Sequence, residues 1–236
     1  MLKGGVKVVS GFVPIPDNPR SPEEYFELGS RLFDPLRASG QLKYNPACFM
    51  MEHISQCWLF KWLHWKGQNF DVTHSVADNP KKNTPSYHIV QHQKFEWLLD
   101  AATLDPRPDV FVWIDFGILH VQGVTVAVIL EFLRRVEREQ AVAIPGCWDK
   151  RVLPIDDQNP CWRFCGGLMV VPRQHIFELD MAVKINAMKH IHETRNLSWE
   201  VNTLARVEQA GTVPLWWYKA DHNETMFTAY PETAHA

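Results

Sequence analysis

The sequence predicts a single α/β domain in which helices flank a mostly parallel central sheet. Three observations favour this class. Five apolar residues in succession, 110–114, predict a strand that is buried on both faces, as is typical of parallel sheets. Strand-like and helix-like stretches alternate along the chain. The 236 residues are enough for one large core, and neither a linker nor a repeat divides them, so we expect residues 1–236 to form one domain.

The individual elements follow from local signals. Ser21, Pro22 and two acids give the start signal of a helix, since a hydroxyl caps free amides and proline suits the first turn. Between residues 125 and 140, apolar residues recur at helical spacing, and basic residues fall on the opposite side. Residues 48–65 mix both patterns and stay unassigned, and 145–160 is rich in loop residues. We expect further helices at 87–102, 173–192 and 198–210, and strands at 6–10, 110–114, 162–171 and 213–218.

Composition narrows the class of protein. The net charge of -3, without a run of lysines, gives no support for broad binding to nucleic acid or to acidic membranes. Five cysteines without a C-x-x-C pair argue against a secreted disulfide framework. No apolar run has the length of a membrane span and no signal region is evident, so we expect a cytoplasmic protein. The 10 tryptophans suggest stacking or sugar-facing surfaces.

Asp115 follows the apolar run directly and is the first candidate for a functional residue. A carboxylate is costly inside a core, so we expect it at the carboxyl end of the strand, where open α/β sheets bind ligands. Gly117 permits a sharp bend and a close approach of the backbone to a ligand. The alternative is an acid that only caps the next turn. The Asp-Phe-Gly triplet does not indicate a protein kinase, because the glycine-rich loop and the H-R-D loop are missing.

The order of these features resembles that of the GT-A class of nucleotide-sugar glycosyltransferases, which has a Rossmann-related fold. The matching features are a first strand and loop, a helix bearing Lys94, the strand ending in Asp115, WRFCGGLMVV, a helix opening at Trp199-Glu200, and a late Asp-His pair. VWIDFGI is similar to the HtrL/YibB-type branch of that fold. The resemblance covers roughly residues 5 to 225, judged by the spacing of the elements. It implies a hexosyl- or pentosyltransferase that moves a sugar from a nucleotide-sugar donor to a hydroxyl acceptor. A glycan is the default acceptor, and a hydroxylated base in nucleic acid is another.

The resemblance also implies a divalent cation. In this class the central strand usually ends in Asp-x-Asp, which holds manganese or magnesium against the diphosphate of the donor. Here Gly117 takes the place of the second acid. The expected metal ligands are therefore Asp115 and His222, with Asp221 as an alternative to the histidine. Without a metal, Asp115 would contact hydroxyls of the sugar or the ribose.

Donor binding is implied for several further positions. Lys94 would offset the charge of the diphosphate, although a solvated lysine is the simpler reading. Gly166 and Gly167 would lie under the donor sugar, where a side chain would collide; a strand bulge or close helix packing explains them equally well. The residues expected to hold the nucleoside follow the first strand: Ser10, Gly11, Phe12 and Val13.

Three carboxylates are candidates for the catalytic base. Glu200 stands near the start of a helix, with Ser198 as its expected cap, where the amide dipoles favour an ionised carboxylate. An ionised carboxylate can take the proton of an acceptor hydroxyl. Asp156 and Asp157, in the loop before Gly166, are rivals. The competing class of function is an inactive GT-A-like protein that binds a glycan or a nucleotide without turnover.

Overall fold

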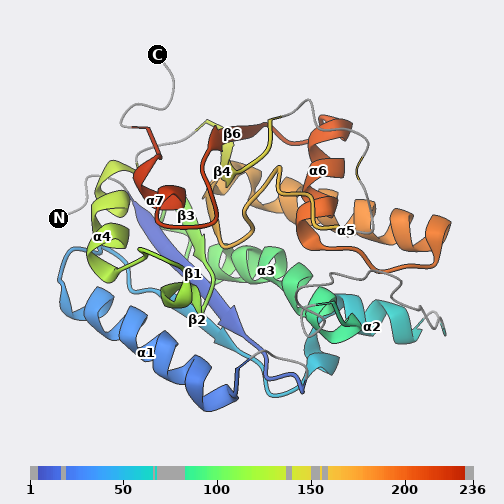
Figure 1. The fold of residues 1–236 in the computed structure, drawn as a ribbon, viewed down its shortest axis with the longest axis horizontal. Helices are drawn as coiled ribbons and strands as arrows, with labels where there is room; N and C mark the ends of the chain where they lie inside the picture. Colours follow the sequence, from blue (N-terminus) through green and yellow to red (C-terminus); the bar gives the residue numbers. More distant parts are fainter. Residues whose placement is uncertain are drawn as a thin grey trace.

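The computed structural model describes residues 5–16, 20–65, 67, 83–136, 140–149, 155 and 159–231. They form an α/β fold around one six-stranded sheet in the order β2-β1-β3-β5-β4-β6, which confirms the predicted fold class (Figure 1). The strands are β1 (Val6–Phe12), β2 (Ala47–Met50), β3 (Val110–Ile114), β4 (Val142–Gly146), β5 (Leu168–Pro172) and β6 (Leu215–Lys219).

Five of the six strands run in the same direction. β1 pairs in parallel with β2 and with β3, and β4 pairs in parallel with β6, whereas β5 is antiparallel to both β3 and β4. Because β5 runs in the opposite direction, it begins at the edge of the sheet where its neighbours β3 and β4 end. The residues that precede β5 therefore lie beside those that follow β3, and the amide of Asp115 donates to the carbonyl oxygen of Gly167 at 3.0 Å.

Helices cover both faces of the sheet, because alternate residues of the buried strands point to opposite sides. Phe111 and Trp113 of β3 join one apolar cluster, and Val112 and Ile114 join the other. Helices α2, α3, α5 and α6 pack on the first face, and α1, α4 and α7 pack on the second (Figure 1). The helices are α1 (Pro22–Ala38), α2 (Trp58–Trp65), α3 (Pro85–Leu104), α4 (Val126–Arg135), α5 (Arg173–Thr194), α6 (Glu200–Ala210) and α7 (Thr225–Thr228). None of the helices in the described ranges has the length and apolar character needed to cross a membrane.

The expected helices exist, with changes at their ends. Ser21 and Glu24 form a capping box at the start of α1, as the start signal predicts. The expectation that Ser198 caps α6 is wrong: Trp199 is the N-cap residue, it makes no capping hydrogen bond through its side chain, and Glu200 is the first helical residue. Helix α4 ends at Arg135, earlier than its apolar pattern suggests.

The strands show larger differences. β5 starts at Leu168, because the residues from 162 to 167 form the turn that leads into it. Two strands were missed. All of β2 except Ala47 falls in the unassigned stretch, and the last two residues of β4 fall in the stretch expected to be loop. Proline and glycine normally interrupt a strand. Here Pro145 and Gly146 extend the parallel register with β6, and the carbonyl oxygen of Pro145 accepts a hydrogen bond from the amide of Cys165 at 2.7 Å.

Candidate active site

A cavity of about 280 Å³ opens at the carboxyl ends of β1 and β3. Its lining comes from the residues after β1, the residues after β3, the turn before β5, the start of α6 and one side of α3. In open α/β sheets this edge is the usual place for a ligand, because the loops there diverge and leave a crevice. The cavity is therefore the candidate active site.

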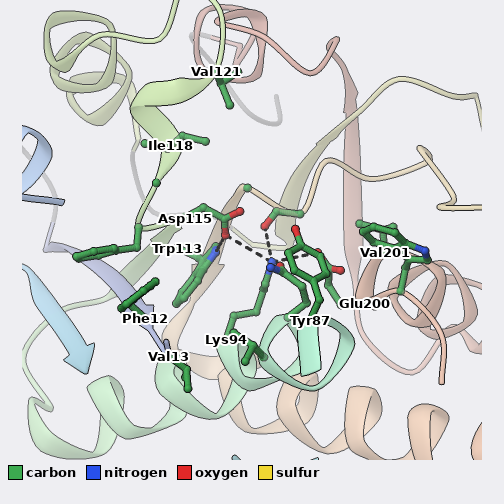
Figure 2. A pocket seen from close by; sticks show the side chains of 18 of the residues that line it. Phe12, Val13, Tyr87, Lys94, Trp113, Asp115, Ile118, Val121, Glu200 and Val201 are labelled. Carbon is green, nitrogen blue, oxygen red and sulfur yellow. Dashed lines mark hydrogen bonds and ion pairs between the residues drawn. The ribbon is translucent and has the colours of Figure 1, made fainter. Parts of the chain in front are cut away.

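The ammonium group of Lys94 is the centre of the site. It projects from α3, and the exposed fraction of the side chain is only 2%. Its Nζ atom donates to the carbonyl oxygen of Gly166 at 2.9 Å and to Oε1 of Glu200 at 3.1 Å, and it lies 3.6 Å from Oδ1 of Asp115 (Figure 2). A buried ammonium is costly unless it is paired, so this lysine requires the two acids. The simpler reading of Lys94 as a solvated surface lysine is wrong.

The charge of Lys94 is set by two opposing influences. Burial, the larger single influence, lowers the pKa of the ammonium, but Asp115 and Glu200 outweigh it and raise the pKa above the ordinary lysine value. Lys94 is therefore charged at neutral pH. Two carboxylates around one ammonium leave one negative charge in excess. Such a site suits ligands whose O–H groups donate hydrogen bonds.

Asp115 is held from its own strand and remains open toward the cavity. Nε1 of Trp113 donates to Oδ1 of Asp115 at 2.7 Å, and the Trp113 ring also lies under the Lys94 ammonium, 5.7 Å from Nζ to the ring centroid. The exposed fraction of the Asp115 side chain is 36%, so an oxygen of the carboxylate can reach a ligand. As expected, the acid stands just beyond the carboxyl end of β3 and lines the cavity.

Glu200 approaches Lys94 from the opposite side (Figure 2). It is the first residue of α6, and the exposed fraction of its side chain is 6%. The partial positive charge of the helix N-terminus and the neighbouring ammonium both stabilise a carboxylate there. Gly166 makes this arrangement possible, because a Cβ atom at position 166 would lie 2.2 Å from Oε1 of Glu200.

The other glycines of the cavity have different neighbours. A Cβ atom at Gly167 would lie 3.2 Å from Cδ1 of Ile118, a tight contact that a small shift would relieve. At Gly11 it would lie 2.4 Å from the Trp97 ring, so that glycine serves the packing of β1 against α3. At Gly117 it would lie 2.9 Å from Cε1 of Tyr25.

Most of the predicted site residues meet in this cavity. Ser10 does not line it: the side chain is fully buried, and its hydroxyl donates to the carbonyl oxygen of Ile114 at 2.6 Å. Asp156 and Asp157 lie outside the described residues. Asp221 is exposed in the turn after β6. The predicted residues that line the cavity are Gly11, Phe12, Val13, Lys94, Asp115, Gly117, Gly166, Gly167, Glu200 and His222.

Of the aromatic walls of the cavity, the sequence pointed to Phe12 and to Trp199 beside Glu200, and the other rings were missed. On one side, the rings of Phe12 and Tyr25 have centroids 5.1 Å apart, and Phe116 stacks on Phe12 at 5.3 Å. On another side Tyr87 is half-buried, and burial, with smaller effects of Glu200 and Asp115, raises the pKa of its phenol well above the ordinary value. For the other rings, the abundance of tryptophan was the only signal, and it indicates no position. Trp97, Trp113, Trp162 and Trp199 also line the cavity.

The described residues do not form a full ligand set for the divalent cation that the resemblance implies. Magnesium, manganese and calcium need several oxygen ligands around one point. Among the described residues, no three His, Cys, Asp or Glu side chains gather where they could hold a metal ion. Asp115 and His222 both line the cavity, but Oδ1 of Asp115 already accepts from Trp113 and faces Lys94. His222 is exposed, and its ring lies edge-on to Trp162 at 5.4 Å.

Comparison with known proteins gives structural likenesses only. No family model matches the chain. No curated protein sequence matches it either. One similar solved structure is a glycosyltransferase involved in the glycosylation of the major capsid of PBCV-1, at 10% identity and a TM-score of 0.47, covering 92% of this chain and 81% of that one. Another is mouse xyloside xylosyltransferase 1 in its apo form, at 8% identity and a TM-score of 0.40, covering 91% of this chain and 84% of that one. Neither likeness assigns a donor or an acceptor to this chain.

Proposed function

We propose that residues 1–236 form one glycosyltransferase domain that moves a sugar from a nucleotide-sugar donor to a hydroxyl acceptor. The observation that carries the proposal is the array of the buried Lys94 and Glu200 with the half-open Asp115, in an aromatic-walled cavity at the carboxyl ends of β1 and β3. The array offers acceptors for sugar hydroxyls and a carboxylate that can act as a base. The similarity of VWIDFGI to the HtrL/YibB-type branch is part of this proposal.

The donor would lie between β1 and the turn before β5. Phe12 and Tyr25 present an aromatic wall on which a nucleobase can stack. The open oxygen of Asp115 accepts from a hydroxyl of the ribose or the donor sugar, and the sugar ring lies against the turn of Gly166 and Gly167, which lines the cavity. The diphosphate belongs on the side of the cavity away from the excess negative charge.

Glu200 would act as the base in an inverting transfer. The acceptor oxygen forms a bond to the anomeric carbon, its proton passes to the Glu200 carboxylate, and the bond between that carbon and the diphosphate breaks with its electron pair going to the diphosphate. Trp199, next to Glu200 in the chain, and Trp162 line the cavity and can stack on the acceptor ring. A glycan is the first candidate acceptor, and a hydroxylated nucleic-acid base is the second. The residues named in this step act without a metal ion, since among the described residues no three His, Cys, Asp or Glu side chains gather around one point.

A panel of nucleotide sugars tests the proposal. A bound donor raises the unfolding temperature by mass action, so a thermal-shift screen identifies the nucleotide and the sugar. The donor that binds is then incubated with the protein without an acceptor. Slow release of free nucleotide is the result expected of a transferase. Tight binding without release would instead indicate the competing class, an inactive GT-A-like protein that holds a glycan or a nucleotide. If no nucleotide sugar changes the unfolding temperature, the proposal is wrong.

A further inference from the structure

An ammonium group fills the space between the carboxylates of Asp115 and Glu200. Nζ of Lys94 lies 3.1 Å from Oε1 of Glu200 and 3.6 Å from Oδ1 of Asp115, and the two acids reach it from opposite sides (Figure 2). The carbonyl oxygen of Gly166, at 2.9 Å, completes the set. Oxygen atoms of two acids and one carbonyl are also what magnesium or manganese would choose as ligands.

The surroundings leave little room for an added metal ligand. A Cβ atom at Gly117 would lie 2.9 Å from the Tyr25 ring, so an acid at this position would require Tyr25 to move. A Cβ atom at Gly166 would lie 3.2 Å from Nζ of Lys94 and would overlap Glu200. A side chain at either glycine would thus meet closely packed neighbours.

We propose that Lys94 is the fixed cation of this site and that the transfer runs without a divalent metal. The statement about the transfer rests on the proposed function. The statement that Lys94 is the cation of the site rests on the contacts within the protein alone. The contacts of Nζ with Glu200, Asp115 and the carbonyl oxygen of Gly166 hold the ammonium in place. With Lys94 in place, Asp115 needs no metal to balance it and is assigned to hydroxyl contacts with the donor.

Binding of Mn²⁺ to the protein alone tests the claim directly. Free Mn²⁺ is measured by electron paramagnetic resonance during titration of the wild type, Lys94→Ala and Lys94→Met. Lys94→Ala removes the charge and opens space between Asp115 and Glu200, so it should bind Mn²⁺ at least about tenfold more tightly than the wild type. Lys94→Met removes the charge but fills the space, so it should show little of this gain. The gain should disappear when Asp115→Asn is added to Lys94→Ala.

A second measurement uses the wild type only and holds even if the lysine variants fail to fold. The dissociation constants of UDP, GDP and ADP are determined by calorimetry in excess chelator and in Mn²⁺. For any of them that binds, the two constants should agree within about threefold, which is below 1 kcal/mol.

The outcomes separate this inference from the proposed function. Tight Mn²⁺ binding by the wild type that Asp115→Asn abolishes would overturn the inference, whatever the protein does. Nucleotide binding that needs Mn²⁺ and loses this need in Asp115→Asn would overturn it as well. If no nucleotide binds under either condition, the proposed function is in doubt, and the Mn²⁺ titration of the protein alone still decides the inference.

Discussion

Gly166 and Gly167 are adjacent, yet the same substitution should affect them very differently. A Cβ atom at 166 would lie 2.2 Å from Oε1 of Glu200, whereas ordinary van der Waals contact begins near 3.4 Å, so the carboxylate must move by about 1 Å. The atom that must move is the end of a flexible side chain, so the backbone can stay in place. The substitution therefore disturbs mainly the contact between Glu200 and Lys94 and leaves the course of the backbone unchanged.

These contacts determine how large the expected changes in the free energy of unfolding and in the rate are. Gly166→Ala should lower the free energy of unfolding by about 1–3 kcal/mol, the usual cost of overpacking. A catalytic group displaced by about 1 Å can lose ~10²-fold in rate. Gly167→Ala meets Ile118 at 3.2 Å and Asp115 at 3.6 Å, so it should cost less than about 1.5 kcal/mol and keep most of the activity.

Two measurements on both variants test whether Gly166→Ala is the more damaging change. Urea unfolding at 25 °C gives the free energy of unfolding, and release of nucleotide from the bound donor gives the rate. The reasoning would be refuted if Gly167→Ala were the more damaging change, or if Gly166→Ala kept the wild-type rate. A Gly166→Ala variant that unfolds easily but turns over normally would show that Glu200 has no part in the chemistry.

Three further variants test single residues. Asp115→Asn should keep the fold and weaken donor binding or turnover at least tenfold, roughly 1.4 kcal/mol, in calorimetry and in the nucleotide-release assay; near-normal values would reduce Asp115 to a turn residue. Glu200→Gln should lower the rate by ~10²–10⁴ while donor affinity barely changes, and normal turnover beside an inactive Asp156→Asn or Asp157→Asn would show that the base is one of those acids. His92 lies between the His88 carbonyl oxygen and the Thr203 hydroxyl, and burial lowers the pKa of its ring. Below about pH 6.5 the unfolded chain therefore binds more protons than the folded one, and stability is lost as the pH falls through this value. The free energy of unfolding at pH 7, 6 and 5 should fall more steeply in the wild type than in His92→Asn, and equal slopes would contradict this assignment.

Local signals determined much of this fold. The apolar run of β3 needs both faces buried, and that alone predicts a central strand with Asp115 beyond its end. Ser21 and Glu24 mark the start of α1 because both partners of a capping box lie within one turn. The alternation of strands and helices is enough to predict the α/β class.

The local sequence pattern was insufficient to predict the burial of Lys94 or the existence of β4. Helix α3 buries Lys94 and His92 together with apolar residues, so no polar face distinguishes it, and the lysine looked like a surface residue. β4 contains Pro145 and Gly146, and only its pairing with β6 makes a strand of them. Contacts with residues distant in the sequence offset the unfavourable free energy of burying Lys94 and of placing Pro145 and Gly146 in a strand.

The candidate site was decided by the tertiary structure. The sequence identified Asp115, Lys94, Gly166 and Glu200 as separate candidates, each with a simpler explanation. The reversed direction of β5 brings Gly166 to the edge where β3 ends, and α6 adds Glu200 from the other side. Neither the burial cost of an ammonium nor its compensation by two carboxylates exists in the extended chain. Both arise only when residues 106 positions apart, Lys94 and Glu200, come within hydrogen-bond distance.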